Sequence, residues 1–452
     1  MVASDQADLA AYVAAERRLL AHSGFELSGD PQQARRFRLD HVTRFLEGRG
    51  RPDARATVHV AGTKGKGSTS TMVEAILRAA GGHTLLLTSP DVHSARERIV
   101  VAGESIAAGR FAELADELLA EPAAEGWSYF ELLTVMGWLA GAREGCDWQV
   151  LEVGLGGRLD TTNAVAAKHV AAILPIDLEH TAILGDSIRE IAAQKAGILT
   201  GPSACVVAPM RDSASRVIAA RAVEVGAELH PVADECAATV GRHNLDGQAL
   251  ELRTPLRTYC GLELPLLGRH QTENAATAVR AAELAWEREY GEELPEAAVR
   301  AGLARVRLPA RMEPVSRRPL TILDGMHTPL AARRVAQALE ELKLPRPRVL
   351  LFGMLAGREP EALVAELRAA IDLAVVAPPS SSRADDPAHA ERALAEAGVP
   401  TQRAASVEQG LAHAEALAGE GGCVVVGGSL YTAAEARELL LAVGGDRALG
   451  LR

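Results

Sequence analysis

A glycine-rich segment at residues 62–68, with the sequence Gly-Thr-Lys-Gly-Lys-Gly-Ser, constrains the fold of this chain more than any other feature. It follows a short apolar run at residues 58–61, and the stretch after it has the apolar periodicity of a helix. A buried strand, a glycine-rich turn and a helix start form a cradle for phosphates, because glycines let backbone N–H groups crowd around the anion and the helix directs its positive end at it. The segment therefore predicts a nucleotide-binding loop.

The segment differs from the P-loop pattern G-x-x-x-x-G-K-[ST] at two positions. Val60 stands where the first glycine is expected, and Gly67 separates Lys66 from Ser68. Lys66 still supplies a point charge for the phosphates, and the Ser68 hydroxyl can reach a phosphate-bound Mg²⁺. We interpret the segment as a P-loop variant.

Composition narrows the class of protein. A chain of 452 residues predicts two or three domains. The formal net charge of −11 argues against a nucleic-acid partner, which usually needs a concentrated basic face. Five scattered cysteines without a C-x-x-C pair indicate reduced thiols, and no run reaches the ~20 apolar residues of a membrane span. We expect a cytoplasmic protein that binds neither nucleic acid nor a membrane.

Apolar runs that favour strands alternate with alanine-rich helical stretches through most of the chain. The expected strands of the first part are residues 57–61, 84–88, 148–153, 169–174 and 205–207. This alternation predicts a parallel sheet covered by helices on both faces. Residues 226–267 differ, because short runs with Gly, Asn and Pro there indicate a few antiparallel strands.

A second lobe is expected after residues 305–319, where prolines and arginines interrupt the apolar pattern and predict an interdomain linker. The alternation then restarts, with expected strands at residues 320–323, 349–352, 373–376 and 423–426. We predict an α/β fold of two domains, residues 1–308 and 309–452.

Three residues of the first lobe could carry chemistry, and each also has a plain structural reading. Glu152 ends a buried strand, where a metal or cation would offset the cost of burying a carboxylate, but it could instead be a glutamate at a wet strand edge. His180 could bind a divalent ion or be a solvated loop histidine. Lys195 could belong to a site or could simply be a cation at a helix C-terminus.

The second lobe contributes Asp324 and His327, just past its first expected strand. Ligands of open α/β sheets bind beyond the carboxyl ends of the strands. The alternative is a tight strand-to-helix turn with Pro329 at the helix start. Ser89 lies at the equivalent end of a strand of the first lobe.

These motifs come in one order, at strand ends, and together they resemble the folylpolyglutamate synthase/dihydrofolate synthase family of the Mur ligase superfamily. The resemblance covers the chain from about residue 35 to its end and is carried by residues 62–68, 88–90, 97–99, 152–163, 180, 195–198, 268–276, 324–329 and 428–431. It implies a P-loop-containing, Mur-ligase-like central ATPase domain and a smaller Rossmann-like C-terminal domain.

The resemblance implies an ATP- and Mg²⁺-dependent ligase, most often a monomer, that adds L-glutamate to a folate. ATP phosphorylates the folate carboxylate, and the amino group of glutamate then displaces phosphate from the acyl phosphate. Whether dihydropteroate is also a substrate stays open. Three alternatives remain: another Mur-type ligase with a non-folate carboxylate substrate, a P-loop NTPase without ligase activity, and a catalytically decayed binding protein.

The resemblance also assigns roles to individual residues. The residues implied to bind ATP are Gly62, Thr63, Lys64, Gly65, Lys66, Gly67, Ser68, Asn274, Arg311 and Asp324. Those implied to position Mg²⁺ are Ser68, Ser89, Glu152 and His180. The implied catalytic set is Lys66, Glu152, His180, Lys195, Asp324 and His327, with Lys195 matching a lysine that the family carbamylates.

Three residues depart from the family pattern. Asp91 replaces a histidine, Met326 an alanine and Thr328 an asparagine. Loss of the carboxamide at position 328 removes two donors and one acceptor, which puts the positioning of the amino-acid substrate in doubt. None of the three touches the ATP-binding segment.

Overall fold

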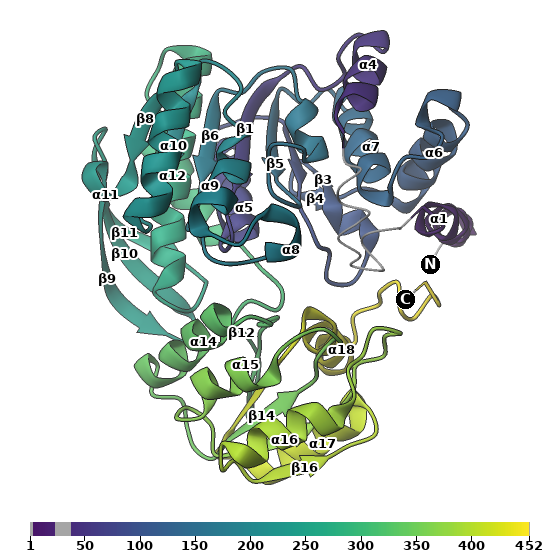
Figure 1. Cartoon of the computed structure of the whole chain (residues 1–452), viewed down its shortest axis with the longest axis vertical. Helices are drawn as coiled ribbons and strands as arrows, with labels where there is room; N and C mark the ends of the chain where they lie inside the picture. Colours follow the sequence, from purple (N-terminus) through teal and green to yellow (C-terminus); the bar gives the residue numbers. More distant parts are fainter. Residues whose placement is uncertain (1–2, 23–37, 452) are drawn as a thin grey trace.

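Two sheets, one in each half of the chain, form the framework of the molecule (Figure 1). The computed structural model describes residues 3–22 and 38–451. Within these residues the first sheet has eight strands in the order β4-β3-β2-β5-β1-β6-β7-β8, and the second has six in the order β12-β13-β17-β14-β15-β16. The predicted α/β class is confirmed.

The first sheet is parallel from β2 to β8 and antiparallel at the β3 and β4 edge. Its strands are β1 (Ala56–Ala61), β2 (Thr84–Leu87), β3 (Ile99–Val101), β4 (Glu104–Ser105), β5 (Trp148–Glu152), β6 (Val170–Ile173), β7 (Ala204–Val207) and β8 (Glu228–Pro231). Every residue of β1, β5 and β6 is buried, as expected for central strands covered on both faces.

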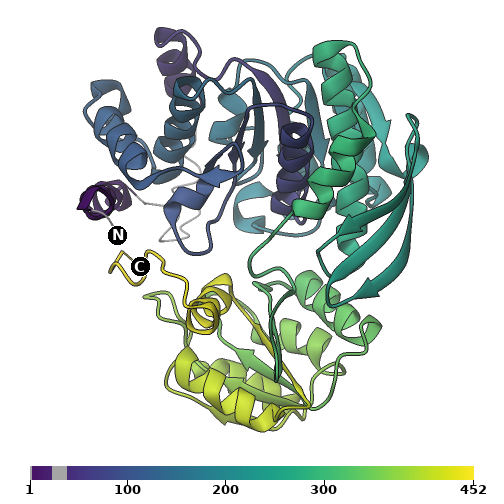
Figure 2. The ribbon, with the colours of Figure 1, turned by 180° about the vertical axis from the view of Figure 1, so that it is seen from behind.

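Helices cover both faces of this sheet (Figures 1 and 2). The longer ones are α1 (Ala3–Leu20), α4 (Asp40–Gly48), α5 (Lys66–Ala79), α6 (Ala108–Leu119), α7 (Tyr129–Arg143), α9 (Ile188–Ala196), α10 (Asp212–Val225), α12 (His270–Tyr290) and α13 (Glu296–Arg305). The short ones are η1 (Ala95–Arg98), η2 (Pro122–Ala124), η3 (Thr161–Ala164), α8 (Thr181–Leu184) and α11 (Val232–Glu235).

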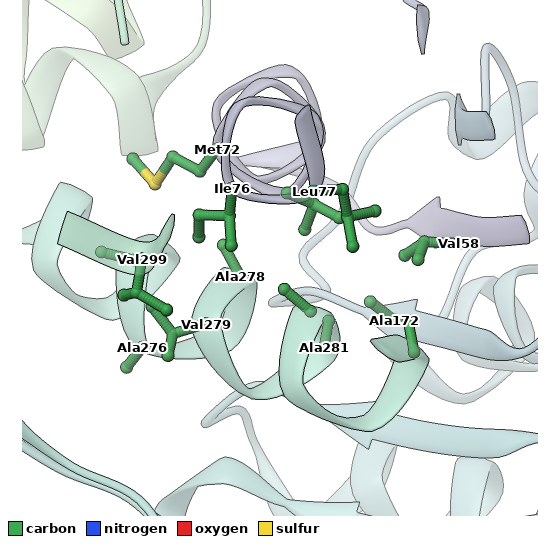
Figure 3. Close-up of a cluster of buried hydrophobic side chains, with 14 of the residues drawn as sticks. Val58, Met72, Ile76, Leu77, Ala172, Ala276, Ala278, Val279, Ala281 and Val299 are labelled. Atoms are coloured by element: carbon green, nitrogen blue, oxygen red, sulfur yellow. The ribbon is translucent and has the colours of Figure 1, made fainter. Parts of the chain in front are cut away.

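The largest core cluster joins α5, α12 and α13 to one face of the sheet. Figure 3 shows Ile76 and Leu77 of α5 above the small side chains Ala278 and Ala281 of α12. Small residues let the helices approach closely. The approach is closest at Gly302 of α13, where a Cβ would lie 2.6 Å from the Cα of Ile76. This packing fixes the helix that follows the glycine-rich loop.

A separate antiparallel sheet interrupts the α/β pattern, as the sequence predicted for residues 226–267. It consists of β9 (Ala237–Asn244), β10 (Gly247–Arg253) and β11 (Thr258–Leu264). Its buried leucines join the same core cluster as α5 and α12.

The second lobe surrounds the six-stranded sheet. Its strands are β12 (Glu313–Arg317), β13 (Leu320–Leu323), β14 (Arg348–Phe352), β15 (Leu373–Val376), β16 (Thr401–Arg403) and β17 (Cys423–Gly427). Its helices are α14 (Pro329–Glu341), α15 (Pro360–Leu367), α16 (Pro387–Glu396), α17 (Val407–Ala418) and α18 (Leu430–Leu441).

The expectation of a linker at residues 305–319 is only partly right. Its first residue ends α13, and β12 pairs antiparallel with β13 at the edge of the second sheet. Pro314 is compatible with this position because an edge strand does not need every backbone N–H for pairing. The domain division at residues 308 and 309 stays a prediction.

All five cysteines are free, and they differ in exposure. Cys146, Cys205 and Cys423 are buried, Cys236 is partly buried and Cys260 is exposed. Among the helices of the described residues, none combines the length and the apolar character needed to cross a bilayer.

Candidate active site

The glycine-rich loop connects the carboxyl end of β1 to the first turn of α5. Gly62 has a φ of +152°, and a Cβ there would lie 2.6 Å from the Cβ of Leu174. Gly65, the residue before α5, has a φ of +91°, and a Cβ there would lie 2.5 Å from Oδ1 of Asn274 on α12. Both positions therefore require glycine, and Asn274, which the resemblance assigns to ATP binding, lies directly against the loop.

Glu152 lies beside this loop, because β5 pairs with β1 and brings Glu152 opposite Val60. Its Oε2 lies 3.4 Å from the place of a Cβ on Gly67, and it accepts a hydrogen bond of 3.1 Å from the N–H of Ser89. The side chain is buried, so the wet-edge reading is wrong. Burial raises the pKa of Glu152, while Lys66 acts in the opposite direction. The site thus holds a buried carboxylate beside a cation.

A second carboxylate pairs with the loop from the segment before α8. The Nζ of Lys64 lies 3.1 Å from Oε1 of Glu179, and both side chains are largely buried. Burial opposes ionisation of Glu179, but Lys64 and then Lys66 outweigh it and lower the pKa to about 2. His180, more than a third exposed, has its Nε2 3.8 Å from the same oxygen. Burial lowers the pKa of His180, so the ring is available as a neutral ligand.

Lys195 reaches the loop from the last turn of α9. Its Nζ donates a hydrogen bond of 2.6 Å to the carbonyl of Gly62, and the side chain is buried. Burial and then Lys66 lower the pKa of Lys195 to about 7. Lys195 does lie in the last turn of its helix, as the structural reading expected, but its amine is enclosed at the glycine-rich loop.

The second lobe contributes groups that follow β13. Oδ2 of Asp324 accepts a hydrogen bond of 2.9 Å from the N–H of Met312, and burial raises the pKa of Asp324 against the effect of Arg311. The guanidinium of Arg311 lies against Gly325, 2.8 Å from the place of a Cβ there. Asp324 and Arg311, both assigned to ATP binding by the resemblance, thus lie close to the same turn.

His327 extends this group toward the first lobe. Its Nδ1 donates a hydrogen bond of 2.9 Å to the carbonyl of Gly325, which leaves Nε2 as an acceptor. Burial and then Lys64 lower the pKa of His327 to about 4. Lys64 belongs to the glycine-rich loop of the first lobe, so its charge acts on a histidine of the second lobe.

Each residue that departs from the family pattern has a structural role. Asp91 accepts a hydrogen bond of 2.7 Å from Nε of Arg98 and is buried. Thr328 caps α14, with its side chain accepting from the N–H of Ala331. Met326 is buried in the core of the second lobe. These roles account for the side chains present without reference to substrate.

The sequence reasoning missed Glu179 and Arg358. Arg358, on the loop between β14 and α15, lowers the pKa values of His180 and His327, and Glu179 raises the pKa of Arg358. The strand-end rule that pointed to Asp324 could have pointed to Arg358, since it follows β14. No sequence signal pairs Lys64 with Glu179, which is 115 positions away.

Among residues 3–22 and 38–451, no three His, Cys, Asp or Glu side chains gather in a way that could hold a metal ion. This arrangement does not resemble a site that encloses a metal with protein ligands alone. It is compatible with Mg²⁺, which usually binds through one or two carboxylates, substrate phosphates and water.

Family models match most of the chain. Residues 60–282 match the Mur ligase middle domain, and residues 310–430 match the Mur ligase glutamate ligase domain. The folylpolyglutamate synthase of Lacticaseibacillus casei is 30% identical over 417 residues, covering 89% of this chain and 94% of that protein. The dihydrofolate synthase/folylpolyglutamate synthase of Mycobacterium tuberculosis is 32% identical over 368 residues, covering 77% of this chain and 75% of that protein.

Some relatives are longer. A probable bifunctional folylpolyglutamate synthase/dihydropteroate synthase of Haloferax volcanii is 33% identical over 421 residues, covering 89% of this chain but 49% of that protein. The chain thus spans about half the length of such archaeal relatives.

Solved structures agree with the family models. Mycobacterium tuberculosis folylpolyglutamate synthase complexed with ADP superposes with a TM-score of 0.86 at 30% identity, covering 96% of this chain and 99% of that one. E. coli FolC in complex with DHPP and ADP gives a TM-score of 0.79 at 30% identity, covering 92% of this chain and 98% of that one.

Proposed function

The chain belongs to the folylpolyglutamate synthase/dihydrofolate synthase family of Mur ligases, as its motifs indicated, and from this premise we propose that it is an ATP-dependent ligase that adds L-glutamate to a folate. The observation that carries the proposal is the meeting of the glycine-rich loop with Glu152, Glu179 and Lys195 at one end of the first sheet.

The loop binds the triphosphate of ATP in this proposal. Backbone N–H groups at the start of α5 and the ammonium of Lys66 would neutralise the phosphates, which is the main requirement of phosphoryl transfer. Asn274 and Arg311 would contact the nucleotide from α12 and from the second lobe. The folate carboxylate attacks the γ-phosphorus and ADP leaves; the glutamate nitrogen then attacks the acyl carbon and phosphate leaves.

The residues beside the loop fit a magnesium ion. Glu152 offers a buried carboxylate whose ionisation burial disfavours, so a divalent cation would stabilise it. Ser68 in the first turn of α5, Ser89 and His180 complete the proposed ligand set, directly or through water. Bound there, the ion supplies positive charge to the phosphates.

Lys195 is proposed as a site of carbamylation. An amine with a pKa of about 7 is about half unprotonated at neutral pH and largely unprotonated at slightly alkaline pH. Its nitrogen can then attack the carbon of dissolved CO₂ and release one proton, which leaves a carbamate anion. That anion would no longer repel a metal beside Lys66.

A substrate panel tests the ligase proposal. Phosphate release is measured with ATP, Mg²⁺ and L-glutamate in the presence of tetrahydrofolate or dihydropteroate, and mass spectrometry identifies the amide product. We expect a glutamylated product with at least one of the two pteridines. ATP hydrolysis without an amide product would instead favour an NTPase, and product with only a non-folate carboxylate would favour another Mur-type ligase.

Matched variants sharpen this test. Lys66→Ala should lower kcat/KM by at least about 100-fold, the typical effect of removing one group that stabilises transition-state charge. Arg216→Ala, at an 83% exposed side chain on α10, should leave the rate unchanged.

The proposal includes a cytoplasmic monomer. Five free cysteines favour a reducing compartment. Size-exclusion chromatography with light scattering tests the monomer, which predicts a mass near 47.6 kDa.

A further inference from the structure

The last ten described residues, 442–451, leave the second lobe and lie against the first (Figures 1 and 2). We call this segment the C-terminal strap. It begins at Ala442, whose φ of +51° ends α18. Both views place the far end of the strap beside α1.

Asp446 is the polar centre of the strap. Its carboxylate is 1% exposed and accepts hydrogen bonds of 2.7 and 2.8 Å from the hydroxyl of Tyr12 on α1. It also accepts a bond of 2.9 Å from the N–H of Ala95, and its own N–H donates 2.8 Å to the carbonyl of His93. One buried carboxylate therefore joins α1, the strap and the segment before β3.

Apolar side chains reinforce this attachment. Leu451 is buried in the cluster that contains Tyr12, Ala95 and Phe111, and Leu449 packs against the same cluster. The end of the strap is thus part of the core of the first lobe, although the helix before it belongs to the second.

Helix α18 contacts the same segment of the first lobe. Arg437 donates a bond of 3.0 Å to Nε2 of His93, so Nδ1 carries the proton and donates 3.0 Å to Glu438. Nε of Arg437 also donates to Glu313 of β12, 2.9 Å away. The second lobe therefore holds His93 from two directions, through α18 and through the strap.

The segment that is held in this way begins at the active site. Ser89, at its start, donates its N–H to Glu152. Between Ser89 and Ala95 the chain folds back on Glu97, which accepts from the N–H groups of Val92 and His93 at 2.8 and 3.2 Å. These bonds close the turn that lies between Ser89 and Ala95.

We propose that the C-terminal strap positions Ser89 against Glu152, with Asp446 as the positioning residue. The strap makes the geometry of the site in the first lobe depend on the end of the chain that follows the second lobe. The kinetic part of this inference rests on the proposed function, which assigns Ser89 and Glu152 to the magnesium and phosphate site.

Asp446→Asn and Tyr12→Phe test the inference in the full chain. Asn keeps the shape of the Asp446 side chain but replaces one oxygen that accepts hydrogen bonds with an NH₂ group that cannot. Phe removes the hydroxyl of Tyr12 and keeps the packing of its ring on Phe111. We expect hydrogen exchange at residues 90–98 to accelerate about tenfold, because the bonds lost involve a charged group, while peptides of β14 and β15 stay unchanged. We expect kcat/KM for ATP to fall at least threefold.

The control is Asp212→Asn, at a 90% exposed carboxylate, which should change neither quantity. If both variants act through the Tyr12–Asp446 bond, the double variant will be no worse than Asp446→Asn alone. If Asp446→Asn does not fold, Tyr12→Phe reports on the same bond.

Two results would overturn the inference: unchanged exchange at residues 90–98, or faster exchange with wild-type kcat/KM, which would make the strap a purely stabilising element. If the wild type lacks ligase activity, the proposed function fails, while the exchange measurement still decides whether the strap restrains the segment.

Discussion

At Lys195, burial and a neighbouring cation both disfavour the charged amine. The side chain lies under the glycine-rich loop with its Nζ on the carbonyl of Gly62, and Lys66 is nearby. The pKa of about 7 follows from this enclosure. A lysine with an ordinary pKa stays charged to about pH 10, so the difference has a measurable consequence for stability.

Between pH 7 and pH 9 the folded chain binds less than one proton at Lys195, whereas the unfolded chain binds one. The contribution of Lys195 to the free energy of unfolding therefore rises with pH. Relative to Lys195→Met, the wild type should gain up to about 1.4 kcal/mol per pH unit in this range. Urea denaturation at pH 7, 8 and 9 in CO₂-free buffer measures the difference, and a constant difference contradicts the low pKa.

The ion pair between Asp91 and Arg98 is buried, and burial should increase the stability that is lost when one partner is removed. Asp91→Ala should lower the free energy of unfolding by about 3 kcal/mol, because it removes the carboxylate that faces a largely buried guanidinium. The pair Arg317–Asp246 has the same 2.7 Å separation but is exposed, so Asp246→Ala should cost less than about 1 kcal/mol. Equal losses in denaturant titrations would show that burial does not matter here.

The sequence predicted those site residues whose positions are set by the pattern of their own segment. The loop at residues 62–68 and Glu152 are set by local strand and glycine patterns, and both are where they were expected. The Lys64–Glu179 and Lys195–Gly62 contacts join residues more than a hundred positions apart. Such contacts depend on how strands are ordered in the sheet, which a single sequence does not encode locally.

At the scale of elements, apolar periodicity predicted the central strands and most helices, while weakly apolar edges were missed. β12 has four partly buried residues, one exposed residue and one proline, so its pattern looked like a linker. β16, three residues long with two exposed side chains, was also missed. Edge strands carry little apolar signal because one side faces water.

The contact between α13 and α5 depends on a missing side chain. Gly302→Ala would place a Cβ 2.6 Å from the backbone of Ile76, so the helices must separate. We expect a loss of about 1–3 kcal/mol despite the better helix propensity of alanine. Gly48→Ala, at a helical glycine with open space around it, should be neutral or stabilising. Thermal denaturation of both variants compares them, and equal melting temperatures would contradict the close packing.

At the scale of the molecule, the proposed site draws on residues of both lobes. Lys64 and Glu179 come from the first lobe, and Arg311, Asp324 and His327 come from the second. Neither lobe alone holds the full set, so closure of one lobe on the other can act as a gate for the reaction.

Nucleotide binding should therefore stabilise the whole chain. A non-hydrolysable ATP analogue with Mg²⁺ at about 100 times its Kd should add about 2.7 kcal/mol to the free energy of unfolding. Removing Mg²⁺ with EDTA, or the charge with Lys66→Ala, should reduce this gain, whereas Arg216→Ala should not. Scanning fluorimetry measures the shift in Tm, and a full shift in Lys66→Ala would contradict the assigned role of the loop.

Because the cysteines differ in exposure, one of them can be labelled selectively with a fluorescent dye. Only the thiolate reacts with maleimides, and burial raises the pKa of the thiols at positions 146, 205, 236 and 423 to between about 11 and about 12. Cys260 on β11 is the exposed thiol. A fluorescent dye attached there, paired with an acceptor on the second lobe, would follow the distance between the lobes during turnover without removal of any native cysteine.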